Sequence, residues 1–311
     1  MRLVLEYILE WVIFLRMELI NKAIRKYYET IRERKKNNIL LKISNGEFVK
    51  GINNTEIREQ KIILSMKTYL PRYNSVVMCI KSLLNQTVKP DRFIVWLDDN
   101  VPKNQPTKDM LELCQYGVEY RFTKDDLRPH GKYYYAMQEY PNDIVITVDD
   151  DLLYSDDLIE SLMNSHKRYP ECVCARRTHR MKYYFDSSIK PYTQWRFEDN
   201  ISIKPSFRLF ATGGSGALYP PHLLPLETFD SKLIKKLSLN ADDIWLKCME
   251  MKNNIKVCRV NSVYPMPAEV SDSQKVALNA TNVHENKNDY YLNLIINYFP
   301  ELKEKFTKKY V

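Results

Sequence analysis

DIVITVDDD, residues 143–151, contains the clearest β-strand of the 311-residue chain. Its run of Ile, Val and Thr is typical of a strand buried in a sheet, because β-branched side chains pack well on a pleated surface. The run stops on three consecutive aspartates, Asp149, Asp150 and Asp151. In open α/β sheets, ligands bind outside the carboxyl ends of the strands. The stretch therefore predicts both a buried strand and a site at its end.

Strand and helix patterns alternate on both sides of this stretch. Before it, strands are predicted at KIILSM (61–66), DRFIVWLDD (91–99) and VEYRFT (118–123), and helices at SVVMCIKSLLNQ (75–86), MLELCQ (110–115) and YYYAMQEY (133–140). After it we expect a helix at 157–170, a strand at 171–177, a helix at 241–252, a strand at 256–260 and a helix near 290–298, with Pro/Gly-rich loops between them. This alternation predicts an α/β domain with a mostly parallel sheet, which we place at residues 59–311.

Residues 1–58 form a different segment, predicted to be a helical extension and a linker. LVLEYILEWVIFLRMELI (3–20) is apolar, but its four charged residues argue against a membrane span and against a signal peptide. A basic run follows between Lys22 and Lys36. An apolar helix with a basic run suits an anionic membrane surface, which we assign to residues 1–36. Packing on the catalytic domain, or on a second copy in a homodimer, remains the alternative. The polar residues 37–60 are taken as the linker.

Charge and cysteine content limit the class of protein. The net charge is +8, and the first fifty residues account for +5 of it, so the remainder is nearly balanced. A nucleic-acid-binding surface is therefore not expected. The six cysteines have neither zinc-ligand nor disulfide-framework spacing, which indicates reduced thiols in the cytoplasm. The protein is expected to be cytoplasmic, at the inner face of the plasma membrane where the extension binds lipid. The many Lys, Asn, Ile and Tyr residues suggest an AT-rich bacterial genome.

The three strand-end aspartates carry the main chemical argument. Adjacent carboxylates repel each other, and burying them is costly unless a cation compensates. Mn²⁺ or Mg²⁺ prefers oxygen ligands and bridges carboxylates to substrate phosphates. Strand alternation would put Asp149 and Asp151 on one side and Asp150 on the other, which makes Asp151 a direct metal ligand and leaves Asp149 near a ribose or the metal. The alternative is a solvated turn in which Ser155 or a following aspartate caps the next helix.

Three further features point to the same edge of the sheet. Asp98 and Asp99 end the second strand, where they could meet a nucleoside or serve as turn residues. Asp242 and Asp243 open a predicted helix, where one of them, or Asn240, could instead be an N-cap. The run Thr212–Gly216, which includes Gly213 and Gly214, offers a tight, exposed backbone for a sugar or phosphate, or is a plain turn.

Together these segments, across roughly residues 61–292, resemble GT-A glycosyltransferases. KTYLPRYNSVVMCIKSLLNQTVKPDRFIVWLDDN is similar to the opening of the family 2 group, VITVDDDLLY resembles the D-x-D strand of that group and of exostosin-like enzymes, and NADDIWLKCM resembles their later acidic helix start. The resemblance implies a metal-dependent transfer from a nucleotide sugar, most simply a UDP-sugar, to a glycan or lipid-linked acceptor in bacterial surface polysaccharide synthesis.

The resemblance also implies roles for particular residues. It assigns the nucleobase to Thr68 and Asp99 or Asp98, the diphosphate to Arg128 or Lys132, the D-x-D to Asp149 and Asp151, catalysis to Asp243 with Asp242, and a C-terminal metal ligand to His284. Asp242 stands where family 2 usually has Glu, and Tyr69-Leu70 is an insertion before Pro71, so the assignments within the acidic pair and at Thr68 are open.

Stereochemistry and the class of enzyme are left partly open by the residues. Family 2 likeness favours inversion, with Asp243 as the general base, whereas exostosin likeness favours retention. A nucleotidyltransferase acting on sugar phosphates would also use carboxylates and metal, but SMKTYLPRYN is not its Gly-rich loop. A non-catalytic membrane-associated scaffold would explain the extension but not acids at three separate strand or helix ends. We therefore predict an inverting glycosyltransferase.

Overall fold

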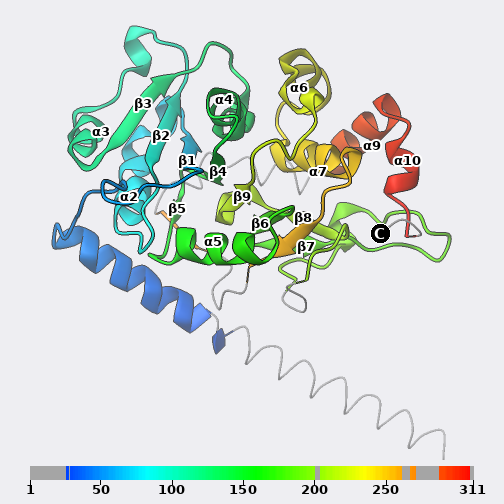
Figure 1. Cartoon of the computed structure of the whole chain (residues 1–311), viewed down its shortest axis with the longest axis horizontal. Helices are drawn as coiled ribbons and strands as arrows, with labels where there is room; N and C mark the ends of the chain where they lie inside the picture. Colours follow the sequence, from blue (N-terminus) through cyan, green and yellow to red (C-terminus); the bar gives the residue numbers. More distant parts are fainter. Residues whose placement is uncertain (1–25, 28, 200–203, 261–266, 271–286, 309–311) are drawn as a thin grey trace, which may run out of the picture.

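The computed structural model describes residues 26–27, 29–199, 204–260, 267–270 and 287–308. A seven-stranded sheet forms the centre, in the order β10-β6-β9-β4-β1-β2-β3. All neighbouring pairs are parallel except those of β9, which runs antiparallel to β4 and to β6. This is the predicted α/β architecture: a mostly parallel sheet with helices on both faces (Figure 1).

The bounds of the elements are as follows. The central strands are β1 (Ile62–Lys67), β2 (Arg92–Leu97), β3 (Val118–Phe122), β4 (Ile144–Val148), β6 (Val173–Ala175), β9 (Ala217–Tyr219) and β10 (Val257–Arg259). Two small two-stranded sheets pair β5 (Leu152–Leu153) with β11 (Ala268–Glu269) and β7 (Thr178–Arg180) with β8 (Leu209–Ala211). The helices are α2 (Tyr73–Leu84), α3 (Lys108–Glu112), α4 (Gly131–Glu139), α5 (Leu158–Arg168), α6 (Ser231–Leu237), α7 (Asp242–Lys252), α9 (Lys287–Tyr298) and α10 (Leu302–Lys305), and short 3-10 turns include η4 (Arg128–His130) and η6 (Gly213–Ser215).

Strand alternation divides the core between the two faces of the sheet. In β1, for example, Leu64 packs with α2 and α5 in one cluster, whereas Ile63 points to the opposite face beside Ala136 of α4. The second face also carries α7 with α9, whose buried side chains join those of β8 and β9. Because α4 and α7 lie on the same face, their first turns meet at the carboxyl ends of β1 and β4.

The sequence analysis missed five short strands, β5, β7, β8, β9 and β11, and two of them, β8 and β9, flank the glycine-rich turn of the site. The segment ATGGSGALYPP (211–221) was taken as a loop, yet it follows β8 and contains β9, which pairs with both β4 and β6. Each of these two strands has only three residues, too few for a periodic pattern to emerge beside glycines and prolines. The consequence is that the sheet closes directly next to the Gly213–Ser215 turn.

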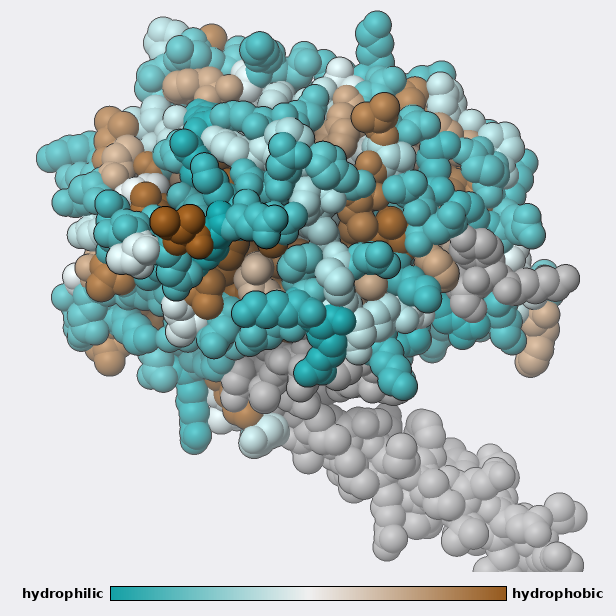
Figure 2. Space-filling view, viewed as in Figure 1, coloured by the Kyte–Doolittle hydropathy of each residue, from teal (hydrophilic) through white to brown (hydrophobic). Residues whose placement is uncertain are grey.

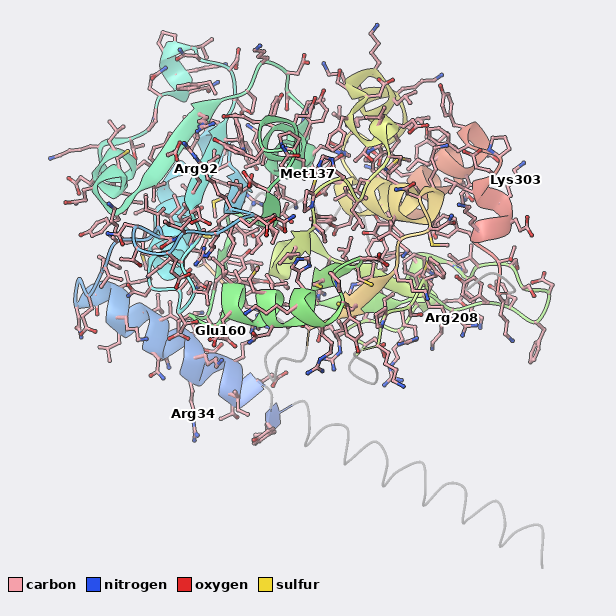
Figure 3. The ribbon with its side chains drawn as sticks, viewed as in Figure 1. Arg34, Arg92, Met137, Glu160, Arg208 and Lys303 are labelled. Atoms are coloured by element: carbon pink, nitrogen blue, oxygen red, sulfur yellow. The ribbon has the colours of Figure 1, made fainter. Side chains whose placement is uncertain are left out.

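The linker predicted from residue 37 begins inside a helix. Residues 29–44 are helical, and Ile43 is buried in the cluster formed with α2 and α5. Lys42 Nζ lies 3.2 Å from Asp156 Oδ2, which ties the helix to the segment before α5. Arg34 points away from the catalytic domain (Figure 3). Residues 1–25, on which the apolar part of the membrane prediction depends, lie outside the described residues. Among those described, no helix has the length and apolarity needed to cross a membrane.

On the face shown in Figure 2, hydrophilic residues predominate and hydrophobic residues form small groups between them. The six cysteines are free thiols. Cys174 and Cys258 lie side by side on β6 and β10, with their Sγ atoms 3.2 Å apart.

Candidate functional site

A cavity of about 360 Å³ lies at the carboxyl ends of the central strands. Its wall includes most of the residues predicted for the site: Asp98, Arg128, Lys132, Asp149, Asp150, Asp151, Gly214, Asp242 and Asp243. These residues come from β2, η4, α4, the end of β4, the η6 turn and the start of α7. The fold therefore brings together groups that are up to 145 positions apart in the sequence, from Asp98 to Asp243.

Lys132 joins the strand-end aspartates to the start of α7. Its Nζ donates to Asp149 Oδ1 at 2.7 Å and lies 2.8 Å from Asp242 Oδ2, and its side chain is only 5 % exposed. Burial alone would lower the pKa of Lys132, but Asp149, Asp242 and Asp243 outweigh it and raise that pKa well above its ordinary value. Lys132 is therefore a permanent cation. It is paired with carboxylates of the protein, and so it is not available to bind a diphosphate as the sequence analysis expected.

Asp243 lies in the first turn of α7 and accepts a hydrogen bond from the Gly213 backbone N–H at 2.9 Å. Burial and the neighbouring Asp242 raise the pKa of Asp243 to about 7, against the opposing effects of Lys132 and the Gly213 N–H. Asp242 behaves differently: although burial opposes it, Lys132 and His130 hold its pKa below the ordinary value. Of these two adjacent carboxylates, Asp242 thus has a lowered pKa and Asp243 a raised one. Such a difference between neighbouring titratable groups is typical of an acid–base site.

The helix-cap interpretation of this acidic pair is wrong. The N-cap position of α7 is Ala241, and no side chain caps it. Asn240 precedes that position, and Asp242 and Asp243 follow it within the helix. Their side chains point to Lys132 and to Gly213 instead. The acids are therefore not explained by the need to end a helix.

Asp150 and Asp151 both meet Arg72, a residue that the sequence analysis did not single out. Arg72 Nη1 donates to Asp150 Oδ1 and lies 3.1 Å from Asp151 Oδ2. The predicted separation of Asp150 from its neighbours by strand alternation is wrong, because β4 ends at Val148 and the chain turns there. Burial, followed by Asp149, raises the pKa of Asp151 to about 7 despite Arg72. Burial also raises the pKa of Asp150.

The glycines of the η6 turn make room for carboxylates. A Cβ on Gly214 would lie 2.5 Å from Asp149 Oδ2, and one on Gly213 would lie 3.2 Å from Asp243 Oδ1. Gly213 is buried rather than exposed as expected. Tyr154 fixes the turn, since its hydroxyl donates to the Gly214 carbonyl and accepts from the Asp149 N–H. Any larger residue at position 214 would displace Asp149.

The residues predicted for the nucleoside do not all reach the cavity. Asp98 lines it and accepts a hydrogen bond from Lys67 Nζ at 2.5 Å. Asp99 is exposed outside it and accepts a hydrogen bond from the Asn104 side chain at 3.0 Å. Thr68 is 1 % exposed, with its hydroxyl beside Asp150, and is not part of the wall. Of the two strand-end acids, Asp98 is therefore the one placed to meet a ligand.

Arg128 is the predicted diphosphate ligand with an open position. Its side chain is 53 % exposed on the cavity wall, and its Nε lies 3.2 Å from the 61 % exposed Asp126. Its backbone has a φ of 52°, in the left-handed region that non-glycine residues rarely occupy. Such local strain is typical of functional sites.

The described residues alone do not complete a metal site. No group of three His, Cys, Asp or Glu side chains among them has the arrangement needed to hold a metal ion, and His284 lies outside the described residues. The donor chemistry nevertheless suits a hard cation: three carboxylates share one cavity, Asp151 is driven towards protonation, and the buried Asp150 Oδ2 has no hydrogen-bond donor among the described groups. Mn²⁺ or Mg²⁺ would draw its remaining ligands from substrate phosphates and water.

Besides Arg72, four charged wall residues were missed: Lys67, Asp126, Arg177 and Glu269. Arg72 ends a 3-10 turn (Leu70–Arg72) and Arg177 lies between β6 and β7, and only the fold shows that they face the aspartates. The Arg in LPRYN, directly before the first helix of the domain, was the available signal for Arg72.

A sheet of this order with carboxylates at its strand ends and an acidic helix start in the same cavity defines a GT-A glycosyltransferase, an enzyme that uses a nucleotide-sugar donor and an acceptor. The family model described as glycosyl transferase family 2 matches residues 66–219 of the chain, which supports this class. No curated protein matches the chain. The match ends before Asp242, so the role of the α7 acids depends on the geometry alone. The likeness to exostosin-type enzymes stays a prediction.

Proposed function

We propose that this enzyme transfers a sugar from a UDP-sugar to a glycan or lipid-linked acceptor, with inversion at the anomeric carbon, as a step in bacterial surface polysaccharide synthesis. The observation that carries the proposal is the position of Asp243. Its carboxylate is held by the Gly213 N–H in the same cavity as the three aspartates that end β4. An in-line sugar transfer needs a base for the acceptor hydroxyl and, in the same cavity, a group that can hold a metal ion beside the leaving diphosphate. Asp243 supplies the base in this proposal, and the three aspartates supply the metal ligands.

In this mechanism Asp243 accepts the proton of the acceptor hydroxyl. The acceptor oxygen forms a bond to the anomeric carbon as the bond from that carbon to the diphosphate oxygen breaks, and the diphosphate leaves with the electron pair. The Gly213 N–H and Lys132 orient the α7 acids, and the pKa of about 7 suits Asp243 to gain and lose a proton near neutrality. Arg128 binds the diphosphate, and Asp98 binds the nucleoside.

Mn²⁺ or Mg²⁺, held by Asp151 with Asp149, would neutralise the charge that develops on the leaving diphosphate. Arg72 keeps Asp150 and Asp151 in place, with Asp150 supporting the ligand set.

Donor hydrolysis tests the proposed reaction. The full-length protein with Mn²⁺ and UDP-sugars is expected to release UDP slowly in the absence of an acceptor, measured by chromatography of the nucleotide products. Release of pyrophosphate from a sugar phosphate and UTP would instead identify a nucleotidyltransferase. If neither product forms with any common nucleotide sugar, the proposed use of a UDP-sugar donor is contradicted.

We also propose that residues 1–36 bind an anionic membrane surface at the inner face of the plasma membrane. Arg34 on the described part of this segment points away from the domain. Lys35 does not: burial lowers its pKa although Asp157 opposes the shift, which places it towards the catalytic domain. Part of the basic run is therefore available to lipid headgroups, and part packs on the protein.

Deletion of residues 1–36 is expected to abolish sedimentation with phosphatidylglycerol vesicles at moderate salt and to leave donor hydrolysis intact. The cut retains Ile43 and Lys42, which attach the helix to the domain. Vesicles of neutral phosphatidylcholine are the control, because cationic side chains gain about 1 kcal/mol each only near an anionic surface. If the shortened protein still sediments with anionic vesicles, the binding surface lies elsewhere.

A further inference from the structure

The segment of residues 177–208 is basic and aromatic, and the reaction described above does not use it. It contains seven Lys/Arg against three Asp/Glu. Three of its rings are well exposed: Tyr184 at 42 %, Phe185 at 105 % and Phe197 at 40 %. Its strand β7 pairs with β8, which leads directly into the η6 turn of the cavity.

Several cations of the segment and cavity are held by aspartates inside the protein. Arg180 pairs with Asp199 at 2.7 Å, and the Asp199 side chain is fully buried, so this pair is structural. Within the cavity, Lys132 and Arg72 are committed to aspartates in the same way. Such pairs are costly to break because each would leave a buried charge behind.

Arg177 differs from these cations. It lines the cavity with a side chain that is 24 % exposed, and its ion pair is a 3.4 Å contact from Nε to Glu198, which is itself 48 % exposed. Arg177 Nε is buried without a hydrogen-bond acceptor among the described groups. A loosely held guanidinium beside an exchangeable surface carboxylate is ready to bind an anion from the cavity.

The position of Arg177 indicates which substrate brings that anion. Arg177 follows β6, on the opposite side of β4 from β1 and β2, where Lys67 and Asp98 mark the nucleoside side. The Arg177 carbonyl accepts from the Thr212 N–H at 3.1 Å, one residue before the Gly213 N–H that holds Asp243. Arg177 is therefore on the side of the base, where the acceptor lies.

Aromatic residues continue the surface outward from Arg177. Phe197 lies edge-on to His179 with ring centroids 4.6 Å apart, one residue from the Glu198 that pairs with Arg177. Tyr192, against which Phe197 also packs, is near the base, since Asp243 is the largest contributor after burial to its raised pKa. Exposed rings beside a cavity are suited to stacking against sugar rings.

Resting on the proposed transferase function, we propose that the acceptor is an acidic saccharide, whose carboxylate or phosphate binds Arg177 while its sugar rings pack on Phe197 and the neighbouring aromatic surface. Glu198 occupies Arg177 until the acceptor displaces it. Arg177 is an acceptor-binding residue in this scheme, and it sets specificity for charge.

The test measures binding of defined saccharides to the full-length protein with UDP and Mn²⁺ by calorimetry. A hyaluronan tetrasaccharide is compared with its carboxyl-reduced form, and N-acetylglucosamine 1-phosphate with N-acetylglucosamine. Wild type is expected to bind at least one acidic probe about tenfold more tightly than its neutral counterpart, as for a hydrogen bond to a charged group. The two pairs distinguish a uronate from a phosphate.

Three variants sharpen the test. R177Q is expected to remove the preference for the acidic probe, and E198Q to increase it by releasing the guanidinium. K182Q makes the same charge change on an exposed residue outside the cavity wall, and this variant is expected to retain the wild-type preference for the acidic probe. Equal binding of acidic and neutral probes, or a preference that survives R177Q, overturns the proposal.

Vesicle sedimentation and donor hydrolysis separate the remaining outcomes. Equal loss of phosphatidylglycerol binding in R177Q and K182Q, without any saccharide preference, would show that the segment binds lipid and would also overturn the proposal. If wild type hydrolyses a UDP-sugar but shows no charge preference, only the acceptor inference fails. If it hydrolyses none, the transferase proposal fails first.

Discussion

Asp243→Asn is expected to reduce sugar transfer by about 10²- to 10⁴-fold, the range typical of losing a general base. Asparagine has nearly the same shape, and its Oδ1 can still accept from the Gly213 N–H, which Asp243 binds at 2.9 Å. The substitution removes a charge that burial already disfavours, so the melting temperature should hold or rise. Transfer is measured as product formed per time at saturating donor, with donor affinity measured separately and expected to be unchanged.

The pH dependence provides a second measurement of the same residue. The pKa of Asp243 is raised to about 7, so the carboxylate is protonated below that pH and ionised above it. A base must be ionised, and wild-type transfer should therefore increase as the pH rises through about 7. The stability effect has the opposite sign: a raised pKa favours the folded state at low pH, and this contribution disappears as the pH rises through 7. The Asp243→Asn variant should lack both trends.

Asp242→Asn is the matched control. Asp242 lies 2.8 Å from Lys132 Nζ, and its pKa is held low, so its charge stabilises the fold. Its loss should cost roughly 1–3 kcal/mol of unfolding free energy, because Lys132 keeps Asp149 but loses a second partner. If Asp243→Asn unfolds early while transferring at the normal rate, Asp243 is structural and another group is the base.

The sequence predicted the parts of this site that lie at the ends of long periodic elements. Asp149, Asp150 and Asp151 follow five consecutive buried residues, Ile144–Val148, and that run identifies a central strand and its carboxyl end. Asp242 and Asp243 open an 11-residue helix, which the pattern also predicted. Since parallel strands end at one edge, the shared cavity followed from the fold class.

The cations could not be predicted in the same way. Arg72 and Arg177 stand in short irregular segments, where neither period nor spacing relates them to a strand end. Their positions follow from long-range pairing: η6 is brought beside the aspartates by β9, a three-residue strand hidden among glycines and prolines. Lys132 was predicted as a ligand of the diphosphate, whereas the fold buries it between Asp149 and Asp242. The sequence does not show this pairing, because it depends on tertiary contacts.

Asp151→Asn is expected to abolish Mn²⁺-dependent binding of UDP, with a loss greater than the 10- to 100-fold typical of changing an outer-shell partner of a metal. The variant keeps an oxygen at the position but removes the charge that a hard cation requires. The fold should be retained, because burial, followed by the charges of Asp149 and Asp150, raises the pKa of Asp151 to about 7. Neutralising Asp151 relieves these unfavourable effects, while Asp150 still holds Arg72.

Titration of UDP with Mn²⁺ and with a chelator, followed by calorimetry, measures this loss directly and needs no acceptor. Asp156→Asn is the matched control: it removes an aspartate five residues away that pairs with Lys42 on the surface and does not line the cavity. Wild type and Asp156→Asn should bind UDP much more tightly with Mn²⁺ than with chelator, whereas Asp151→Asn should bind equally weakly in both. Wild-type affinity that is the same with metal and with chelator would contradict the metal role of the strand-end aspartates, and Arg128, the exposed cation of the cavity wall, would then balance the leaving diphosphate.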